Sequence, residues 1–211
     1  VLVGKYLWNR ALRKEVRELT KKNNSYDASS IDVLKGIDGI RNNPTMYIGP
    51  TDSRGLHHLL WEIIDNAVDE AIMGFGQKII VKIENDGSIS VEDFGRGIPV
   101  DIHQQEKMSA LDLVLTEIHA GGKLRNKNTS YSSSGGIHGI GAAAVNALSN
   151  WMKVTVKRDG YTYHRNFQYG IPQGGKNPQK GSKTTKSGTH INFLPDINIF
   201  EDIVFDHEII K

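Results

Sequence analysis

Residues 55–75 read GLHHLLWEIIDNAVDEAIMGF and carry the clearest helical pattern in the chain. At about 100° per residue, one arc of this helix is apolar: Leu56, Leu60, Ile63, Ile64, Ala67 and Ala71. A stripe about 100° wide on the other side is polar: His58, Glu62, Asp65, Asn66 and Asp69. Such a helix packs on a sheet through its apolar arc, so its polar stripe faces either solvent or a ligand.

The polar stripe holds groups that suit phosphate chemistry. Glu62 lies one turn before Asn66, and His58 lies one turn before Glu62. A carboxylate can take a proton from an attacking water, and a neighbouring histidine can orient that carboxylate. The amide oxygen of asparagine is a hard ligand that suits Mg²⁺. Considered alone, the stripe is more typical of a solvated helix face than of a ligand site.

Two glycine motifs follow this helix. Residues 93–99 read DFGRGIP; the glycines allow a tight turn against a flat ligand, and Asp93 can accept a hydrogen bond from an exocyclic amine. Residues 135–141 read GGIHGIG and precede a predicted helix, which favours an anion site. This second motif is neither a P-loop nor a dinucleotide fingerprint. Helix and motifs together offer a base, an amine acceptor and a phosphate cradle, which describe a nucleotide site.

The rest of the chain predicts alternating helices and hairpins. Segments 78–84 and 88–93 alternate apolar and polar residues around Asp86-Gly87, as in a hairpin. Helices are predicted at 31–41, at 109–119 with Ser109 as N-cap, and at 142–149 after a loop rich in glycine and serine. Strands are predicted at 152–157, 161–168 and 188–194. The pattern favours an α+β fold, a two-layer α/β sandwich whose mixed, mostly antiparallel sheet is covered on one face by helices.

The amino-acid composition and the charge distribution exclude several kinds of chemistry and of binding partner. The 211 residues include no cysteine, which excludes disulfides, thiolate catalysis and cysteine-ligated metals. No apolar run reaches the roughly 18 residues of a membrane helix, and no secretory signal is present, so we expect a cytoplasmic protein without a membrane partner. Residues 1–25 carry seven Lys or Arg against two Glu, and 1–24 are predicted to form a basic amphipathic extension. The whole chain carries +2 and this segment +5, so the remaining −3 provides no basic face for nucleic acid.

Four motifs resemble those of the GHKL superfamily, which unites gyrase, the large heat-shock chaperones, histidine kinases and MutL. They are 62–70 (EIIDNAVDE), 93–97 (DFGRG), 135–141 (GGIHGIG) and 187–189 (SGT). Other stretches are similar to the ATPase domain of the B subunit of bacterial type II topoisomerases, gyrase or topoisomerase IV: 25–31 (SYDASSI), 46–49 (MYIG), 55–59 (GLHHL), 119–123 (HAGGK) and 145–149 (VNALS). The resemblance implies a GHKL ATP-binding domain of the Bergerat type over residues 25–211.

The resemblance also implies a role for each matching residue. Glu62 would be the general base for water attacking the γ-phosphate of ATP, His58 would orient it, and Asn66 would hold Mg²⁺. Asp93 and Thr189 would bind the adenine amine, and the pocket would be completed by Asp69, Gly97, Ile98, Pro99 and Met46. Phosphate contacts would come from Lys123, Gly136, His138, Gly139 and Gly141. Tyr26 would reach the nucleotide of a second subunit, and Arg96 and Arg158 match the rim where aminocoumarin-type inhibitors bind.

At the level of the whole enzyme, the resemblance implies that ATP binding pairs two B subunits and that hydrolysis powers DNA strand passage with the A subunit, at the nucleoid. The chain ends at Lys211, before the family's transducer domain, so we expect this fragment to bind ATP with little turnover. Ser132 stands where a lid lysine is usual. A histidine-kinase-like or MutL-like module is the alternative, although residues 1–25 contain no histidine to accept a phosphate. Gyrase and topoisomerase IV are not distinguished.

Overall fold

A computed structural model describes residues 36–118 and 141–211, all of which belong to one contact unit, residues 35–211. The predicted extension over 1–24 lies outside the described residues, so its boundary with the domain stays a prediction. Within the described ranges, no helix combines the length and the apolar character that crossing a membrane requires.

The helices are α2 (Gly36–Asn42), α3 (Thr45–Ile48), α4 (Ser53–Ile72), α5 (Ala110–Thr116), α6 (Gly141–Ala147) and α7 (His207–Ile210). The strands are β1 (Ile79–Ile83), β2 (Ile89–Asp93), β3 (Ser149–Arg158), β4 (Tyr161–Gln168), β5 (Ile171–Gln173), β6 (Gln179–Lys183) and β7 (Gly188–Pro195). The predicted helices and strands are therefore present, with α2 described only from Gly36. The sequence pattern did not predict α3, β5, β6 or α7. In β6 every residue is exposed, so it offers no alternation of apolar and polar residues to detect.

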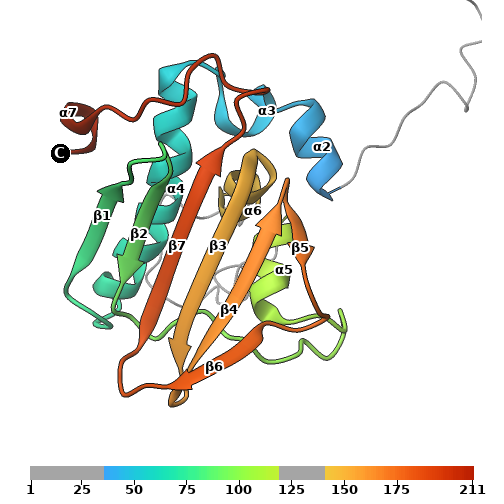
Figure 1. Cartoon of the computed structure of the whole chain (residues 1–211), viewed down its shortest axis with the longest axis vertical. Helices are drawn as coiled ribbons and strands as arrows, with labels where there is room; N and C mark the ends of the chain where they lie inside the picture. Colours follow the sequence, from blue (N-terminus) through green and yellow to red (C-terminus); the bar gives the residue numbers. More distant parts are fainter. Residues whose placement is uncertain (1–35, 119–140) are drawn as a thin grey trace, which may run out of the picture. The chain divides into compact units, whose positions relative to one another are not determined.

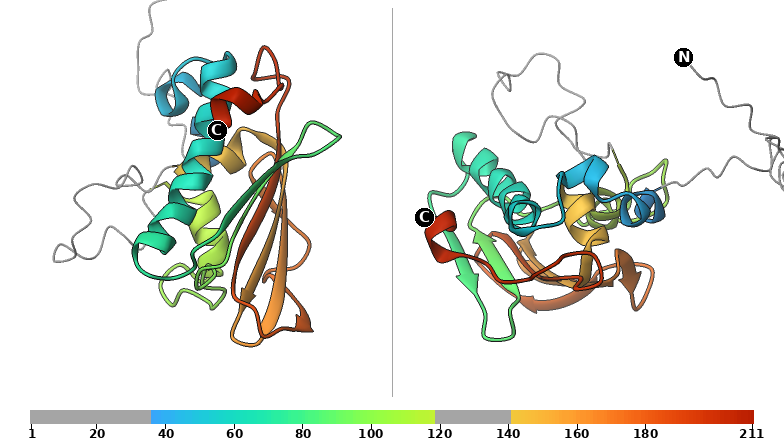
Figure 2. Two further views of the ribbon diagram at one scale, coloured as in Figure 1. Left: turned by 90° about the vertical axis from the view of Figure 1, so that its left-hand side faces the viewer. Right: turned by 90° about the horizontal axis from the view of Figure 1, so that it is seen from above.

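One antiparallel sheet joins all the described strands. Its order is β1-β2-β7-β3-β4-β5, and β6 also pairs with β4. The predicted hairpin places Val81 opposite Val91, on either side of the Asp86-Gly87 turn. Helices α4, α5 and α6 lie on one face of this sheet (Figures 1 and 2). The prediction of an α+β two-layer sandwich is confirmed, and every strand pair in the described part is antiparallel.

Helix α4 packs into the core through the arc that the sequence predicted. The side chains of α4 that are at most 4% exposed are Leu56, His57, Leu59, Leu60, Ile63 and Ala67, so the buried face also includes His57 and Leu59, which lie outside the predicted arc. Alternate residues of the central strands belong to the same core: Val91, Val154, Ile191 and Phe193. Burying each large apolar side chain contributes roughly 1.5–3 kcal/mol. This packing fixes the rotation of α4 about its axis and leaves His58, Glu62, Asp65 and Asn66 of the polar stripe exposed or partly exposed, whereas Asp69 is buried.

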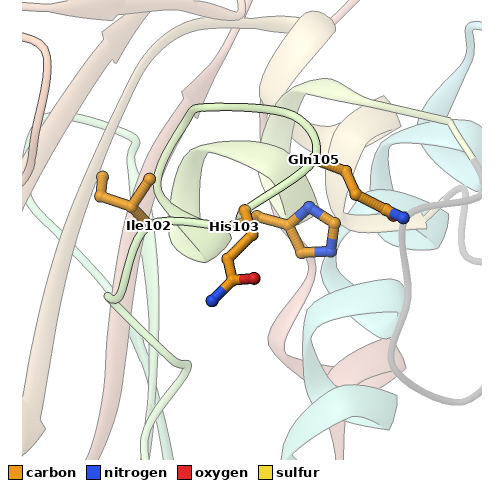
Figure 3. Close-up of a pocket in the computed structure, with 4 residues that line it drawn as sticks. Ile102, His103 and Gln105 are labelled. Carbon is orange, nitrogen blue, oxygen red and sulfur yellow. The ribbon is translucent and has the colours of Figure 1, made fainter.

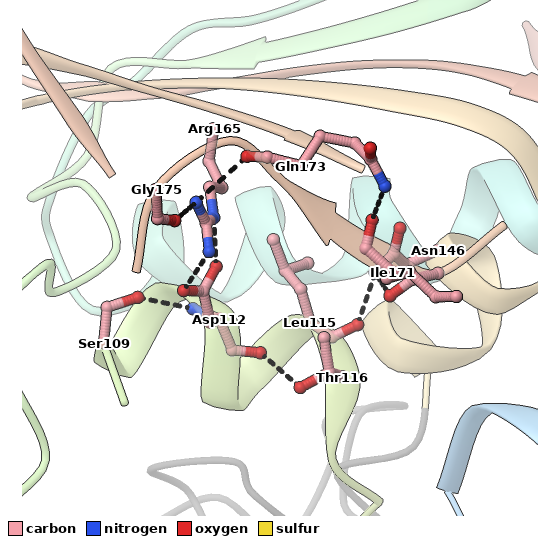
Figure 4. Close-up of polar contacts among 10 residues, drawn as sticks. Ser109, Asp112, Leu115, Thr116, Asn146, Arg165, Ile171, Gln173 and Gly175 are labelled. Atoms are coloured by element: carbon pink, nitrogen blue, oxygen red, sulfur yellow. Dashed lines mark hydrogen bonds and ion pairs between the residues drawn. The ribbon is translucent and has the colours of Figure 1, made fainter. Parts of the chain in front are cut away.

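A buried ion pair joins α5 to β4 (Figure 4). Arg165 Nε and Nη2 donate to Asp112 Oδ1 and Oδ2 at 2.6 and 2.8 Å, and both side chains are at most 6% exposed. Arg165 Nη1 also donates to the backbone carbonyls of Gln173 and Gly175. The predicted N-cap is present as well, because Ser109 Oγ accepts from Asp112 N at 2.9 Å. These contacts fix the start of α5 on the sheet.

We predict that Asp112→Asn lowers the free energy of unfolding by about 3–5 kcal/mol, because the guanidinium charge of Arg165 stays buried without its counterion. Urea unfolding followed by circular dichroism measures the difference. Asp101→Asn, the same chemical change at an exposed loop position, serves as the control and is expected to unfold like the parent. An Asp112→Asn midpoint equal to that of the parent would contradict the assigned role.

Candidate functional site

The polar stripe of α4 brings three predicted residues together. His58 Nε2 lies 3.8 Å from Glu62 Oε1, with the side chains 47% and 21% exposed. Asn66 Nδ2 donates a hydrogen bond of 2.8 Å to the backbone carbonyl of Glu62. Because a carbonyl can only accept, the amide nitrogen is committed to this bond, and the amide oxygen can bind a cation or a water. Asp69, further along the same stripe, is buried.

The first residue of α6 lies directly against the Glu62 carboxylate. A Cβ placed on Gly141 would overlap Glu62 Oε2 and would lie 2.6 Å from Glu62 Cδ. Since Cβ atoms essentially never come this close to other heavy atoms, a side chain at position 141 would displace the carboxylate. Gly141 is the last residue of the predicted phosphate motif, 135–141. The predicted base therefore adjoins the end of that motif.

Asp93, at the end of β2, is fixed by backbone groups from two elements. Asp93 Oδ1 accepts hydrogen bonds from Gly95 N at 2.8 Å and from Thr189 N at 3.2 Å. Thr189 Oγ1 in turn accepts from Ile98 N at 3.2 Å. Two donors to one oxygen fix the carboxyl group, and Oδ2 can accept from a ligand amine. Asp93 and Thr189, which the sequence assigned to one function, are therefore in contact.

Burial sets the protonation behaviour of Asp93. Loss of solvent around the carboxyl raises its pKa above the ordinary value, while the N–H groups of Gly95 and Thr189 act in the opposite direction. The negative charge of Glu70 also raises the pKa. Ionisation of Asp93 therefore destabilises the ligand-free fold, and a ligand amine that donates to the carboxylate would stabilise its ionised form.

The loop after Asp93 approaches two strands closely at Gly97. Gly97 has a φ of 75°, and a Cβ there would lie 2.9 Å from the carbonyl oxygen of Lys157. Both facts require glycine at this position. Arg158 Nη1 donates to the carbonyl of Gly97 at 2.7 Å, so this predicted rim residue is anchored to the Asp93 loop.

The other predicted rim residue, Arg96, is held by a partner that sequence reasoning did not single out. Arg96 Nε and Nη2 donate to Glu70 Oε2 and Oε1 at 3.0 and 2.7 Å, and the guanidinium lies 4.3 Å from the centre of the Phe75 ring. The hydrogen bond from Arg96 lowers the pKa of Glu70 despite its partial burial. Glu70 follows Asp69 in the quoted motif, and this adjacency was the only signal for it.

Met46 does not lie where the sequence placed it. Gly55, at the start of α4, adjoins Ile48 of α3, whereas Gly95 adjoins Glu70 near the end of α4. At 1.5 Å per residue, Gly55 and Glu70 are roughly 22 Å apart. Met46 is 79% exposed on α3. Contrary to the prediction, the structure does not bring Met46 to the pocket around Asp93, whereas Ile98 and Pro99 follow Gly97 directly.

Several predicted contacts lie outside the described residues: Tyr26, Lys123, Gly136, His138 and Gly139. Within the described part, a surface hollow of about 410 Å³ is lined by Ile102, His103, Gln104 and Gln105 (Figure 3). These residues lie on the loop between β2 and α5 and include none of the predicted nucleotide contacts. The candidate site is therefore defined by α4, the Asp93 loop, β7 and the start of α6.

The fold and these residues define an ATP-binding domain of the GHKL class. The family described as "Histidine kinase-, DNA gyrase B-, and HSP90-like ATPase" matches residues 51–198. The chain belongs to this family. Glu62, Asn66, Asp93, Gly141 and Thr189 all fall inside the matched range.

Two known proteins are similar to most of this chain. The chain is 47% identical over 193 residues to the B subunit of DNA topoisomerase 4 of Mycoplasma pneumoniae, an alignment that covers 89% of this chain and 29% of the relative. It is 49% identical over 180 residues to the B subunit of DNA topoisomerase 4 of Staphylococcus aureus, covering 85% of this chain and 26% of the relative. The chain thus spans less than a third of the length of these relatives.

We predict that Asp93→Asn weakens ATP binding roughly 10- to 100-fold, because an amide NH₂ would face the adenine amine and leave a buried donor without an acceptor. Calorimetric titration with a non-hydrolysable ATP analogue and Mg²⁺ measures this. GTP carries an acceptor at the same ring position, so the preference for ATP over GTP should fall as well. Asp86→Asn, at the exposed turn of the same hairpin, is the matched control and should bind like the parent. Equal affinity of parent and Asp93→Asn would contradict the assignment.

The raised pKa of Asp93 gives a second expectation for the ligand-free protein. A carboxyl whose pKa is raised by folding destabilises the fold once pH exceeds its unfolded pKa, and increasingly so up to its folded pKa. The amide introduced by Asp93→Asn cannot ionise, and its oxygen can still accept from Gly95 and Thr189. Asp93→Asn is therefore expected to be more stable than the parent at pH 7, by a margin that shrinks as pH falls towards the ordinary carboxyl range. Thermal unfolding at pH 4 and pH 7 tests the sign, and a margin that grows on acidification would refute it.

Proposed function

We propose that this chain is the ATPase domain of a bacterial type II topoisomerase B subunit, and specifically of topoisomerase IV. Membership of the ATPase family and the identity to the B subunits of topoisomerase 4 support this. In the complete subunit, ATP binding would pair two copies, and hydrolysis would power passage of one DNA duplex through another. The observation that carries the proposal is the contact between Glu62 and Gly141, which joins a carboxylate to the end of a phosphate-binding motif.

Glu62 is the proposed general base. Its carboxylate is only partly exposed, and it lies within 3.8 Å of His58, which can orient it towards an attacking water. Phosphoryl transfer depends mainly on positioning and on stabilisation of charge. The fixed backbone at Gly141 supplies the positioning that this reaction requires. The phosphates themselves would be bound by Lys123, Gly136, His138, Gly139 and Gly141.

Asn66 is the proposed protein ligand for Mg²⁺. Its amide nitrogen is committed to the carbonyl of Glu62, and its exposed amide oxygen is a hard donor of the kind that Mg²⁺ takes from proteins. A bound Mg²⁺ would neutralise charge on the phosphate oxygens. The hydrogen bond from Asn66 to Glu62 thereby keeps the metal ligand one helical turn from the proposed base.

The Asp93 loop is the proposed adenine site. Asp93 Oδ2 would accept from the adenine amine, and Thr189 would assist through the contacts that already join these residues. The pocket would be completed by Asp69, Gly97, Ile98 and Pro99. Arg96 and Arg158, both anchored at this loop, would form the rim that meets aminocoumarin-type inhibitors.

Several partners belong to the complete protein. A second copy would pair with this domain, with Tyr26 reaching the nucleotide of its partner. The A subunit would attach through other domains, and DNA would be held by them, since residues 26–211 lack a basic excess. This role would place the protein at the nucleoid in the cytoplasm.

Topoisomerase IV is favoured over gyrase because both relatives described above carry that name. The test is the complete B subunit assembled with its A subunit and ATP, assayed on linked DNA circles and on relaxed plasmid. Unlinking of circles without introduction of negative supercoils supports topoisomerase IV. Negative supercoiling would identify a gyrase, and no ATP-dependent change in DNA topology would refute the proposed class.

We predict that Glu62→Gln in the complete subunit lowers kcat for ATP hydrolysis at least roughly 100-fold, because the amide cannot accept the proton of the attacking water. The affinity for a non-hydrolysable analogue should change less than about tenfold, since the base acts mainly in the transition state. Coupled phosphate release and calorimetry measure the two quantities. Glu117→Gln, an exposed glutamate after α5, provides the matched control. Unchanged turnover in Glu62→Gln would remove Glu62 from the mechanism.

A further inference from the structure

Helix α6 is held at both of its ends by residues distant in the sequence. At its start, the backbone of Gly141 meets the Glu62 carboxylate. At its end, the carbonyl of Ala147 accepts a hydrogen bond of 2.6 Å from Arg41 Nη1, which comes from α2. A cation at a helix C-terminus is also favoured by the alignment of the peptide dipoles. Arg41 therefore fixes the end of α6 opposite to the one that contacts Glu62.

The place of Arg41 is itself fixed by a buried carboxylate. Arg41 Nη2 donates to Asp196 Oδ2 at 2.6 Å, and the Asp196 side chain is fully buried. Asp196 Oδ1 accepts from Asn198 N and Nδ2, at 3.0 and 2.9 Å. Burial alone would raise the pKa of Asp196, but the hydrogen bonds from Arg41 and Asn198 outweigh it and hold the pKa below its ordinary value. Arg41 and Asp196 therefore form an ionised pair, and both carboxylate oxygens of Asp196 accept hydrogen bonds.

The turn between β4 and β5 closes the same cluster. The guanidinium of Arg41 lies 4.9 Å from the centre of the Tyr169 ring, and Tyr169 has a φ of 51°, a strained value for a bulky residue. Asn146 Nδ2, from α6, donates to the carbonyls of Gly170 and Leu115. Strain of this kind persists only where the surroundings over-determine the conformation. The end of α6 is thus fixed by α2, by this turn and by the end of α5.

Helix α6 is short enough to transmit position from one end to the other. Its seven residues span roughly 9 Å between the first and last Cα. Ala143, Ala144, Val145 and Ala147 are buried, so the helix moves as one packed piece. A shift at Ala147 therefore reappears at Gly141, where the Glu62 carboxylate has no spare room.

We propose that Arg41 is a positioning residue for ATP hydrolysis, which sets the place of Glu62 through α6. The inference rests on the proposed function of Glu62. Arg41 is remote from the adenine site, because it pairs with Asp196 directly after the end of β7, whereas Asp93 contacts Thr189 at the start of that strand. Thr189 and Asp196 are roughly 23 Å apart at about 3.3 Å per residue. Loss of Arg41 should therefore lower turnover and leave nucleotide binding nearly intact.

The test is Arg41→Gln in the complete subunit, with kcat and nucleotide affinity measured separately. We expect kcat to fall about 10- to 100-fold, as displacement of a reacting group by about 1 Å does, and the affinity for a non-hydrolysable analogue to change less than about threefold. Asp196→Asn should reproduce the loss. Phe205→Leu, which weakens the core without a described contact to α6, controls for lost stability and should keep kcat. Equal kcat in Arg41→Gln and the parent, or equal losses in Arg41→Gln and Phe205→Leu, would overturn the proposal.

A double-mutant cycle separates positioning from general damage. Residues at the two ends of α6 share no direct contact, so their effects on kcat should multiply if they act independently. If Arg41 acts through Gly141, then Arg41→Gln combined with Gly141→Ala should lose no more activity than Gly141→Ala alone, and multiplied losses would refute the proposal. Glu62→Gln distinguishes failure of the proposed base from failure of the proposed positioning role. An active Glu62→Gln would refute the proposed base, whereas an inactive Glu62→Gln with a fully active Arg41→Gln would refute only the positioning role.

Discussion

The close approach of the Gly141 backbone to the Glu62 carboxylate is the constraint on which the site depends. It brings a side chain from α4 against the start of α6, although the two residues are far apart in the sequence. Neither helix could be placed this tightly without the sheet. The apolar arc of α4 fixes the rotation of that helix, and the hydrogen bonds at the end of α6 fix the other side of the contact. The carboxylate is therefore positioned by packing before any nucleotide binds.

At Asp93, ligand binding and stability of the fold favour opposite protonation states of the carboxyl group. Burial raises the pKa of the carboxyl, so the ionised group needed to accept from an amine destabilises the empty fold. Hydrogen bonds from Gly95 and Thr189 reduce that cost without removing it. A ligand that donates to Asp93 regains part of it on binding. In the proposed adenine site, the burial that destabilises the ligand-free domain would therefore add to the affinity for a base that carries a donor at that position.

Local periodicity made much of this fold predictable, because α4 and the hairpin around Asp86-Gly87 are specified by residues close in sequence. The same holds for the Asp93 loop, whose tight turn follows from its own glycines. Long-range pairs were not predictable: Arg165 with Asp112, and Arg41 with Asp196, are 53 and 155 residues apart. The misplacement of Met46 has the same origin, since an apolar residue in a family motif says nothing about which end of α4 it adjoins. Strand β6 escaped prediction because an exposed edge strand needs no apolar residues.

The proposed ligand contacts and the proposed catalytic residues lie in different layers of the sandwich. Asp93 and Thr189, the proposed adenine contacts, lie on strands β2 and β7 of the sheet, whereas Glu62, Asn66 and Gly141 lie on helices that pack over it. Strands joined by a continuous hydrogen-bonded ladder cannot shift separately, but helices held by side-chain contacts can move by small amounts. With the proposed roles of these residues, small displacements in the helical layer would change the geometry of hydrolysis before they change recognition of the nucleotide. Arg41, the proposed positioning residue, contacts this helical layer at Ala147, so its loss is expected to lower turnover more than affinity.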